Sequence, residues 1–157
     1  MSKFSLIAMG GTFDIIHRGH LILLENAFEI SDKVIIGLTS DEFVQKKGKT
    51  PIHKYDERLK NLISVIFHKF PNTNFEISQL NNDFGPAVLE KDVQALIVSD
   101  ETSDQGTVLN KLRTERNLPP VEVIVVPMFL AKDGVRISST RIKNSEIDSD
   151  GNLLPID

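Results

Sequence analysis

Residues 4–20 read FSLIAMGGTFDIIHRGH, and this stretch decides the fold. Its first six residues are an apolar run of strand length, which two glycines close. Residues 17–30 then show helical spacing, with Leu24 and Phe28 on one stripe. A buried strand, a glycine turn and a helix, in this order, are typical of the first unit of an α/β protein.

The same alternation continues along the chain. Further apolar runs without in–out alternation occupy residues 33–39, 75–80, 95–99 and 121–126. Helical spacing or helix-start chemistry marks residues 55–70, the segment after Pro86, residues 106–117, and the segment that opens with Ser138, Ser139 and Thr140. Strands of this kind are buried on both faces, so we expect an α/β fold with a doubly wound, five-stranded parallel sheet of the Rossmann-like type. Ligands of such sheets bind beyond the carboxyl ends of the strands.

Composition narrows the class of protein. The 157 residues are 25% charged, carry a formal net charge of -4 and include no cysteine. We expect one domain over residues 1–147, and we expect the acidic, turn-rich segment 148–157 (DSDGNLLPID) to fray. The charge provides no basic field for nucleic acid, and we expect neither a membrane span nor a leader. A cytoplasmic enzyme or binding domain is expected, with no nucleic-acid or membrane partner and an oligomeric state that the sequence leaves open.

The loop after the first strand carries the chemistry. Gly10 and Gly11 have no Cβ, and they predict a sharp turn that lets the backbone approach a ligand. His17 and His20 are three residues apart at a helix start, so they face the same side, where free N–H groups attract phosphate. Two imidazoles there can donate hydrogen bonds to phosphate oxygens and stabilise a transition state. A structural or solvated role remains open for either histidine alone, whereas a zinc site would need a third ligand.

Two stretches carry a family resemblance. GGTFDIIHRGH (residues 10–20) resembles the G-T-F-D-x-x-H-x-G-H signature of the HxGH nucleotidyltransferase superfamily. ISSTRI (residues 137–142) resembles its second signature, at the start of a late helix after the fifth strand. A Ser-Ser-Thr run alone is more often a helix cap, but both motifs occur in order on the expected elements. Arg136, just before the second motif, has no counterpart in the signature and receives no role.

The fourth strand indicates which branch of the superfamily is involved. Residues 98–102 (VSDET), followed by Gly106, Asn110 and Arg113, resemble the corresponding stretch of phosphopantetheine adenylyltransferases of the archaeal and eukaryotic type. Residues 80–86 (LNNDFGP) resemble the acceptor-side loop of the same group. Only one glycine follows Thr102 closely, where two are frequent in that group.

The resemblance implies adenylyl transfer from ATP, accompanied by Mg²⁺, to 4'-phosphopantetheine, giving dephospho-coenzyme A and pyrophosphate. The catalytic residues that it implies are His17 and His20 on the triphosphate, and Thr12 and Lys47 on the acceptor phosphate. Lys49 and then Lys46 are the alternatives to Lys47. The implied nucleotide contacts are the amides of Gly10, Gly11 and Phe13, the residues Ser138, Ser139 and Thr140, the adenosine-side residues Ser99 and Glu101, and Arg113. No protein ligand to the metal is expected.

Two alternatives remain open. One is a cytidylyltransferase, or an adenylyltransferase with a different phosphorylated acceptor. The other is a nucleotide-binding module without activity, which both histidines and the second motif disfavour.

Overall fold

A five-stranded sheet organises the chain, and every neighbouring pair of its strands is parallel. The computed structural model describes residues 3–82, 84–85, 90–99, 104–127, 132, 142, 147–148 and 151–153. The strand order is β3-β2-β1-β4-β5, and their bounds are β1 Phe4–Gly11, β2 Ser31–Thr39, β3 Phe75–Leu80, β4 Ala95–Ser99 and β5 Glu122–Val126. The predicted doubly wound, Rossmann-like sheet is confirmed. Since the chain runs outward from β1 to β3 and then returns to β4, the order reverses between β1 and β4, where such sheets bind ligands.

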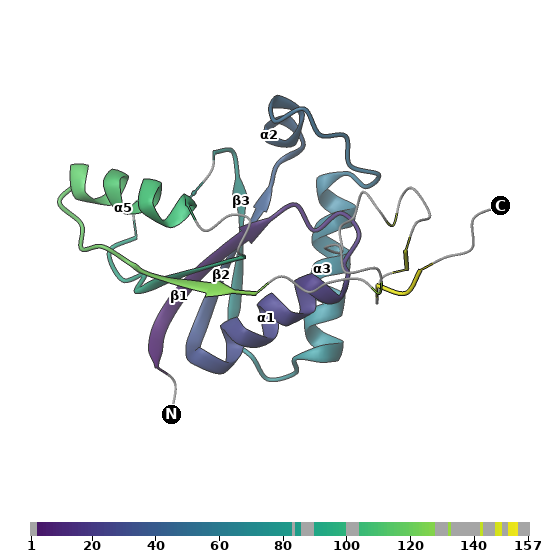
Figure 1. Ribbon diagram of the computed structural model, residues 1–157, viewed down its shortest axis with the longest axis horizontal. Helices are drawn as coiled ribbons and strands as arrows, with labels where there is room; N and C mark the ends of the chain where they lie inside the picture. The colour runs from purple at the N-terminus through teal and green to yellow at the C-terminus, as the bar shows by residue number, and fades with distance from the viewer. Residues whose placement is uncertain are drawn as a thin grey trace.

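Helices cover both faces of the sheet (Figure 1). α1 (Arg18–Ile30) and α3 (Tyr55–Lys69) pack on one face, and α5 (Gln105–Glu115) packs on the other. None of the helices in the described part of the chain is long and apolar enough to cross a membrane. The helix expected after Pro86 lies outside the described residues, and of the helix expected from Ser138 only Ile142, which is helical, is described.

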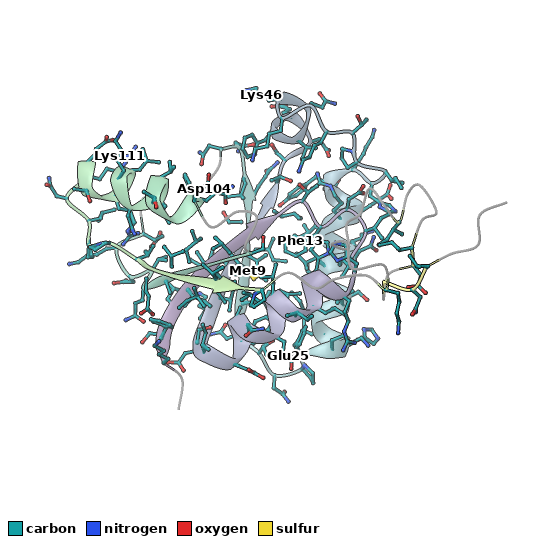
Figure 2. The ribbon with its side chains drawn as sticks, in the orientation of Figure 1. Met9, Phe13, Glu25, Lys46, Asp104 and Lys111 are labelled. Carbon is teal, nitrogen blue, oxygen red and sulfur yellow. The ribbon has the colours of Figure 1, made fainter. Side chains whose placement is uncertain are left out.

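A short helix, α2 (Asp41–Lys46), follows β2 in a segment for which the sequence predicted no helix or strand. The Ser40 hydroxyl caps it by accepting the N–H of Phe43 at 3.1 Å. Six residues are too few to display an apolar period, so this helix left no clear trace in the sequence. It places Lys46 at its last position, above the carboxyl end of β2 (Figure 2).

Alternate strand residues enter two separate apolar layers. In β1, Ile7 and Met9 face the layer with Leu24 of α1, whereas Ala8 faces the layer with Leu109 of α5. Figure 2 shows Met9 and Phe13 inside the molecule and the charged side chains of Glu25, Lys46 and Lys111 around its outside. Burial on both faces explains why β1, β2 and β4 read as nearly continuous apolar runs.

The described part of the C-terminal segment is held by hydrogen bonds. Ile147 is fully buried and forms an antiparallel bridge with Leu153. The N–H of Gly151 bonds to the carbonyl of Asp148 at 3.1 Å, and Asp148 accepts the N–H of Asn152 on its side chain at 2.9 Å. These bonds hold Asp148 close to Gly151 and Asn152, and the expectation that residues 148–157 fray stays a prediction.

Candidate active site

Two stacked imidazoles lie at the start of α1, beyond the carboxyl end of β1. The rings of His17 and His20 have centroids 3.9 Å apart and an interplanar angle of 23°. His17 is the N-cap residue, and its Nδ1 accepts the N–H of Gly19 at 3.1 Å. In return, the Nδ1 of His20 accepts the backbone N–H of His17 at 3.1 Å. The structure thus brings the predicted pair together, and the ring of each histidine accepts a backbone N–H near the other in the first turn of the helix.

These hydrogen bonds fix the tautomer of both rings. A ring nitrogen that accepts a hydrogen bond carries no proton, so each neutral imidazole has its proton on Nε2. Burial, and to a smaller extent the neighbouring His17, hold the pKa of His20 well below the ordinary value of 6.5. The ring of His20 also contacts Phe13, with centroids 4.9 Å apart. His20 is therefore a neutral N–H donor in a fixed orientation.

The sharp turn between β1 and α1 comes at Phe13 rather than at the two glycines. Gly10 and Gly11 belong to β1 and pair with β2. Phe13 has φ 51°, the left-handed region that bulky residues rarely adopt, and its side chain is buried. A Cβ on Gly11 would stand 3.0 Å from the Phe13 ring, and one on Gly10 would stand 3.2 Å from Leu80. The expectation of a glycine turn was wrong because the glycines make room for packing, and the loop stores its strain at Phe13.

The residues predicted to hold the acceptor phosphate, Thr12 and Lys47, lie in the segments that follow two neighbouring strands. Thr12 follows β1 and Thr39 ends β2, and the hydroxyl of Thr39 donates to the hydroxyl oxygen of Thr12 at 3.1 Å. Lys47 is the C-cap residue of α2, exposed, with its Nζ 4.6 Å from the centroid of the Phe43 ring. Gly48, at φ 76°, then reverses the chain, so Lys49 follows on the far side of this turn. Because β1 and β2 are adjacent and parallel, these groups and the histidines all lie beyond the carboxyl ends of the strands.

Arg58 of α3 is a residue of this region that the sequence analysis missed. Its side chain is fully buried. It donates to the carbonyls of Thr12 and Thr39, at 3.0 and 2.8 Å. It also donates to the carbonyl of His53 at 3.1 Å and pairs with Asp41 at 2.9 Å. The sequence did carry a signal, because Arg58 lies on the same helix face as Leu62 and Ile66, at a spacing of four residues, and all three are buried.

Asp14 of the first motif is the other residue that was missed. Its buried carboxylate accepts the N–H groups of Ile52 and His53 at 2.9 and 3.0 Å, and lies 3.1 Å from Nδ1 of His53. It therefore ties the first loop to the segment that leads into α3. Nothing in the spacing of the motif indicated a partner so far along the chain.

The fourth strand gives one placement and one correction. Ser99 ends β4 at the same edge of the sheet, half-buried, as expected. Arg113 is fully buried and donates to the carbonyls of Pro119 and Glu90, at 2.8 and 2.9 Å. Since Glu90 precedes β4, this guanidinium lies toward the amino end of the strand. The prediction that Arg113 contacts a nucleotide is therefore wrong, because its donors serve backbone carbonyls at the opposite edge.

Several predicted contacts lie outside the described residues. They are Glu101, Ser138, Ser139 and Thr140, and Arg136, to which no role was given, also lies outside them. Within the part of the chain that is described, no group of three histidine, aspartate or glutamate side chains is placed to hold a metal ion.

Comparisons with known proteins agree on the family. Residues 8–145 match the model of the cytidylyltransferase-like family. A phosphopantetheine adenylyltransferase of Methanothermobacter thermautotrophicus is 38% identical over 152 residues, which cover 97% of this chain and 91% of that protein. A bifunctional phosphopantetheine adenylyltransferase/NTP phosphatase of Thermoplasma volcanium is 40% identical over 149 residues, which cover 95% of this chain but only 45% of that longer protein.

A solved structure extends the agreement to the fold. The crystal structure of a protein of unknown function from Archaeoglobus fulgidus superposes with a TM-score of 0.70 at 26% identity, over 78% of this chain and 89% of that one. The family match spans both predicted signatures, and the relative from Methanothermobacter aligns over almost its whole length. The chain therefore belongs to the cytidylyltransferase-like family and, within it, to the phosphopantetheine adenylyltransferases.

Proposed function

We propose that the protein transfers the adenylyl group of ATP to 4'-phosphopantetheine, giving dephospho-coenzyme A and pyrophosphate. The observation that carries the proposal is the pair of imidazole N–H donors at the start of α1, in a chain whose relatives bear that activity in their names. Both substrates are small phosphorylated molecules. We also propose a cytoplasmic location, which the absence of cysteine from the sequence suits.

The reaction needs positioning more than acid–base chemistry. A phosphate oxygen of the acceptor attacks the α-phosphorus of ATP, a new P–O bond forms, and the bond to the β-phosphate breaks as pyrophosphate leaves. The acceptor phosphate is already largely ionised at neutral pH, since its second pKa is about 6. The obstacle is to bring two polyanions into line, and oriented donors and positive charge lower it.

The described residues supply such groups on two sides. On the nucleotide side, the Nε2–H groups of His17 and His20 would donate to the triphosphate and to the charge that develops on it. On the acceptor side, the Thr12 hydroxyl and the Lys47 ammonium would hold the attacking phosphate. ATP would enter as its magnesium complex, with the ion held by phosphate oxygens and water rather than by side chains.

Further nucleotide contacts are proposed from the family signatures. Amides at Gly10, Gly11 and Phe13, with Ser138, Ser139 and Thr140, would hold the phosphates. Ser99 and Glu101 would lie beside the adenosine. Of these, Gly10, Gly11, Phe13 and Ser99 end neighbouring strands or follow them directly, which suits a nucleotide laid across the reversal of strand order.

One experiment tests the substrates directly. The purified protein is incubated with magnesium, ATP and 4'-phosphopantetheine, and we expect pyrophosphate release together with dephospho-coenzyme A identified by mass. Matched reactions replace ATP by CTP, or 4'-phosphopantetheine by glycerol 3-phosphate or nicotinamide mononucleotide. Product formation with CTP, or with another acceptor at a higher kcat/KM, would overturn the proposal in favour of a different nucleotidyltransferase. Binding of ATP without product in any reaction would favour a nucleotide-binding module.

A further inference from the structure

A single buried guanidinium joins three loops at the carboxyl edge of the sheet. Arg58 reaches Thr12 in the loop after β1, Thr39 and Asp41 after β2, and His53 before α3, all at 2.8–3.1 Å. Its side chain is fully buried, so these partners take the place of water. The segments that Arg58 contacts contain or adjoin Thr12 and Lys47, the groups proposed to hold the acceptor phosphate.

The contacts of Arg58 lead to the Thr12 hydroxyl through one intermediate. Nη1 of Arg58 lies 3.4 Å from Oγ1 of Thr39, and the Thr39 hydroxyl donates to Oγ1 of Thr12 at 3.1 Å. With its oxygen accepting from Thr39, Thr12 turns its own O–H proton away from Thr39. That proton is then available for an acceptor oxygen.

A second path leads from Arg58 to the lysines. Asp41, the first residue of α2, pairs with Nη2 of Arg58 and also accepts the backbone N–H of Tyr55 at 3.0 Å. Lys47 is the C-cap residue of the same short helix. A helix of six residues has little stability of its own, so this anchor at its first turn sets the position of its far end.

The nucleotide side is held differently. The orientations of His17 and His20 depend on their reciprocal cap bonds within α1 and on their stacked rings. None of the hydrogen bonds that Arg58 makes with the described residues goes to either histidine. The two halves of the site therefore rest on separate hydrogen-bond systems.

We infer that Arg58 is a positioning residue for the acceptor half of the reaction, acting through Thr39 on the Thr12 hydroxyl and through Asp41 on the α2 helix that carries Lys47. This inference rests on the proposed function. It predicts that weakening Arg58 changes the handling of the phosphorylated acceptor while leaving the handling of ATP unchanged.

Arg58→Lys is the test variant, because lysine keeps the charge but lacks the planar fork that serves several acceptors at once. Arg113→Lys is the matched control, since Arg113 is equally buried and also donates to backbone carbonyls, but toward the amino end of β4. Both variants should lose stability. Only Arg58→Lys should raise the KM for 4'-phosphopantetheine and lower kcat. Its kcat/KM for this substrate should fall roughly tenfold or more, as expected for losing a hydrogen bond to a charged group. The KM for ATP should stay within about twofold in both.

A second pair of variants avoids the folding risk. Thr39→Val removes the hydroxyl link at nearly constant shape, and Thr39→Ser restores it. Thr39→Val should lower kcat roughly fivefold, as for one neutral hydrogen bond, and Thr39→Ser should recover most of it. Equal kinetics for the valine and serine variants would overturn the link through Thr39. A rise in both KM values for Arg58→Lys, or the same kinetics as Arg113→Lys, would overturn the inference as a whole.

Hydrogen exchange without substrates separates this inference from the proposed function. In Arg58→Lys, amides of residues 44–55 should exchange faster than in the wild type, whereas amides 17–21 should be unchanged. In Arg113→Lys neither group should change. If the wild type makes no dephospho-coenzyme A but this pattern appears, the proposed function fails and the positioning role stands. If the wild type is active and the pattern is absent, the inference fails alone.

Discussion

The two ring nitrogens of His20 can be tested separately. Nδ1 accepts the backbone N–H of His17, and the proton on Nε2 is the proposed donor to the triphosphate. In His20→Asn, the side-chain oxygen comes close to the place of Nδ1 and nothing reaches that of Nε2. In His20→Gln, the side-chain N–H group comes close to the place of Nε2 and the cap acceptor is lost. The two variants therefore separate the structural from the catalytic contribution.

We expect the less stable of the two variants to be the more active one. Both variants lose the ring contacts with His17 and Phe13, so this cost cancels in their comparison. Losing the cap acceptor costs about 1 kcal/mol, or roughly 3 °C in melting temperature for a chain of this size, so the glutamine variant should be the less stable. Losing a preorganised donor costs on the order of 3 kcal/mol in the transition state, so the asparagine variant should turn over roughly a hundredfold more slowly.

The assay combines pyrophosphate release at saturating substrates with thermal unfolding followed by circular dichroism. The asparagine variant should be the more stable and the less active of the two. Turnover within a few-fold of the wild type in His20→Asn would refute the assignment of Nε2–H as a donor. The same rank order in stability and activity would show that both losses follow from folding alone.

Two further predictions concern pH and the lysines. The pKa of His20 is lowered in the folded protein, so the unfolded chain binds more protons below about pH 6.5, and the free energy of unfolding should fall as the pH drops from that value. Urea titrations between about pH 5 and 7.5 measure this dependence. His20→Asn should make the free energy of unfolding less dependent on pH, and an unchanged dependence would contradict the prediction. Lys47→Ala should raise the KM for 4'-phosphopantetheine roughly tenfold and leave the KM for ATP almost unchanged, because it removes one hydrogen bond from a charged group. Lys46→Ala is the neighbouring control, and a larger effect of Lys49→Ala would assign the role to Lys49 instead.

The strands were predictable because of where they lie. The run at 95–99 coincides with β4, because a strand buried on both faces is apolar at nearly every position. The run at 75–80 coincides with β3, an edge strand whose exposed positions, Glu76 and Gln79, are polar. The predicted helix 17–30 corresponds to α1, with His17 as its cap rather than its first residue. The motif also predicted that His17 and His20 lie together, because a spacing of three residues in a helix determines it.

The supporting residues were not predictable in the same way. Asp14 meets the N–H groups of residues that lie 38 and 39 positions away, and Arg58 meets Thr12 at a separation of 46. Local spacing carries no information about such contacts. The sequence gives no sign of the strained backbone at Phe13 either, because two adjacent glycines lead one to expect the turn at Gly10 and Gly11.

The groups proposed to bind the triphosphate and those proposed to bind the acceptor phosphate are held in place in different ways. The histidines cap each other over four residues, so their arrangement survives wherever α1 forms. The acceptor half depends on a guanidinium from α3 that reaches loops after two strands, so it assembles only when α3 is docked. A partly unfolded form that loses α3 would therefore keep its imidazole donors but lose the alignment of Thr12 and Lys47. Destabilisation of α3 should consequently impair acceptor use before it impairs ATP binding.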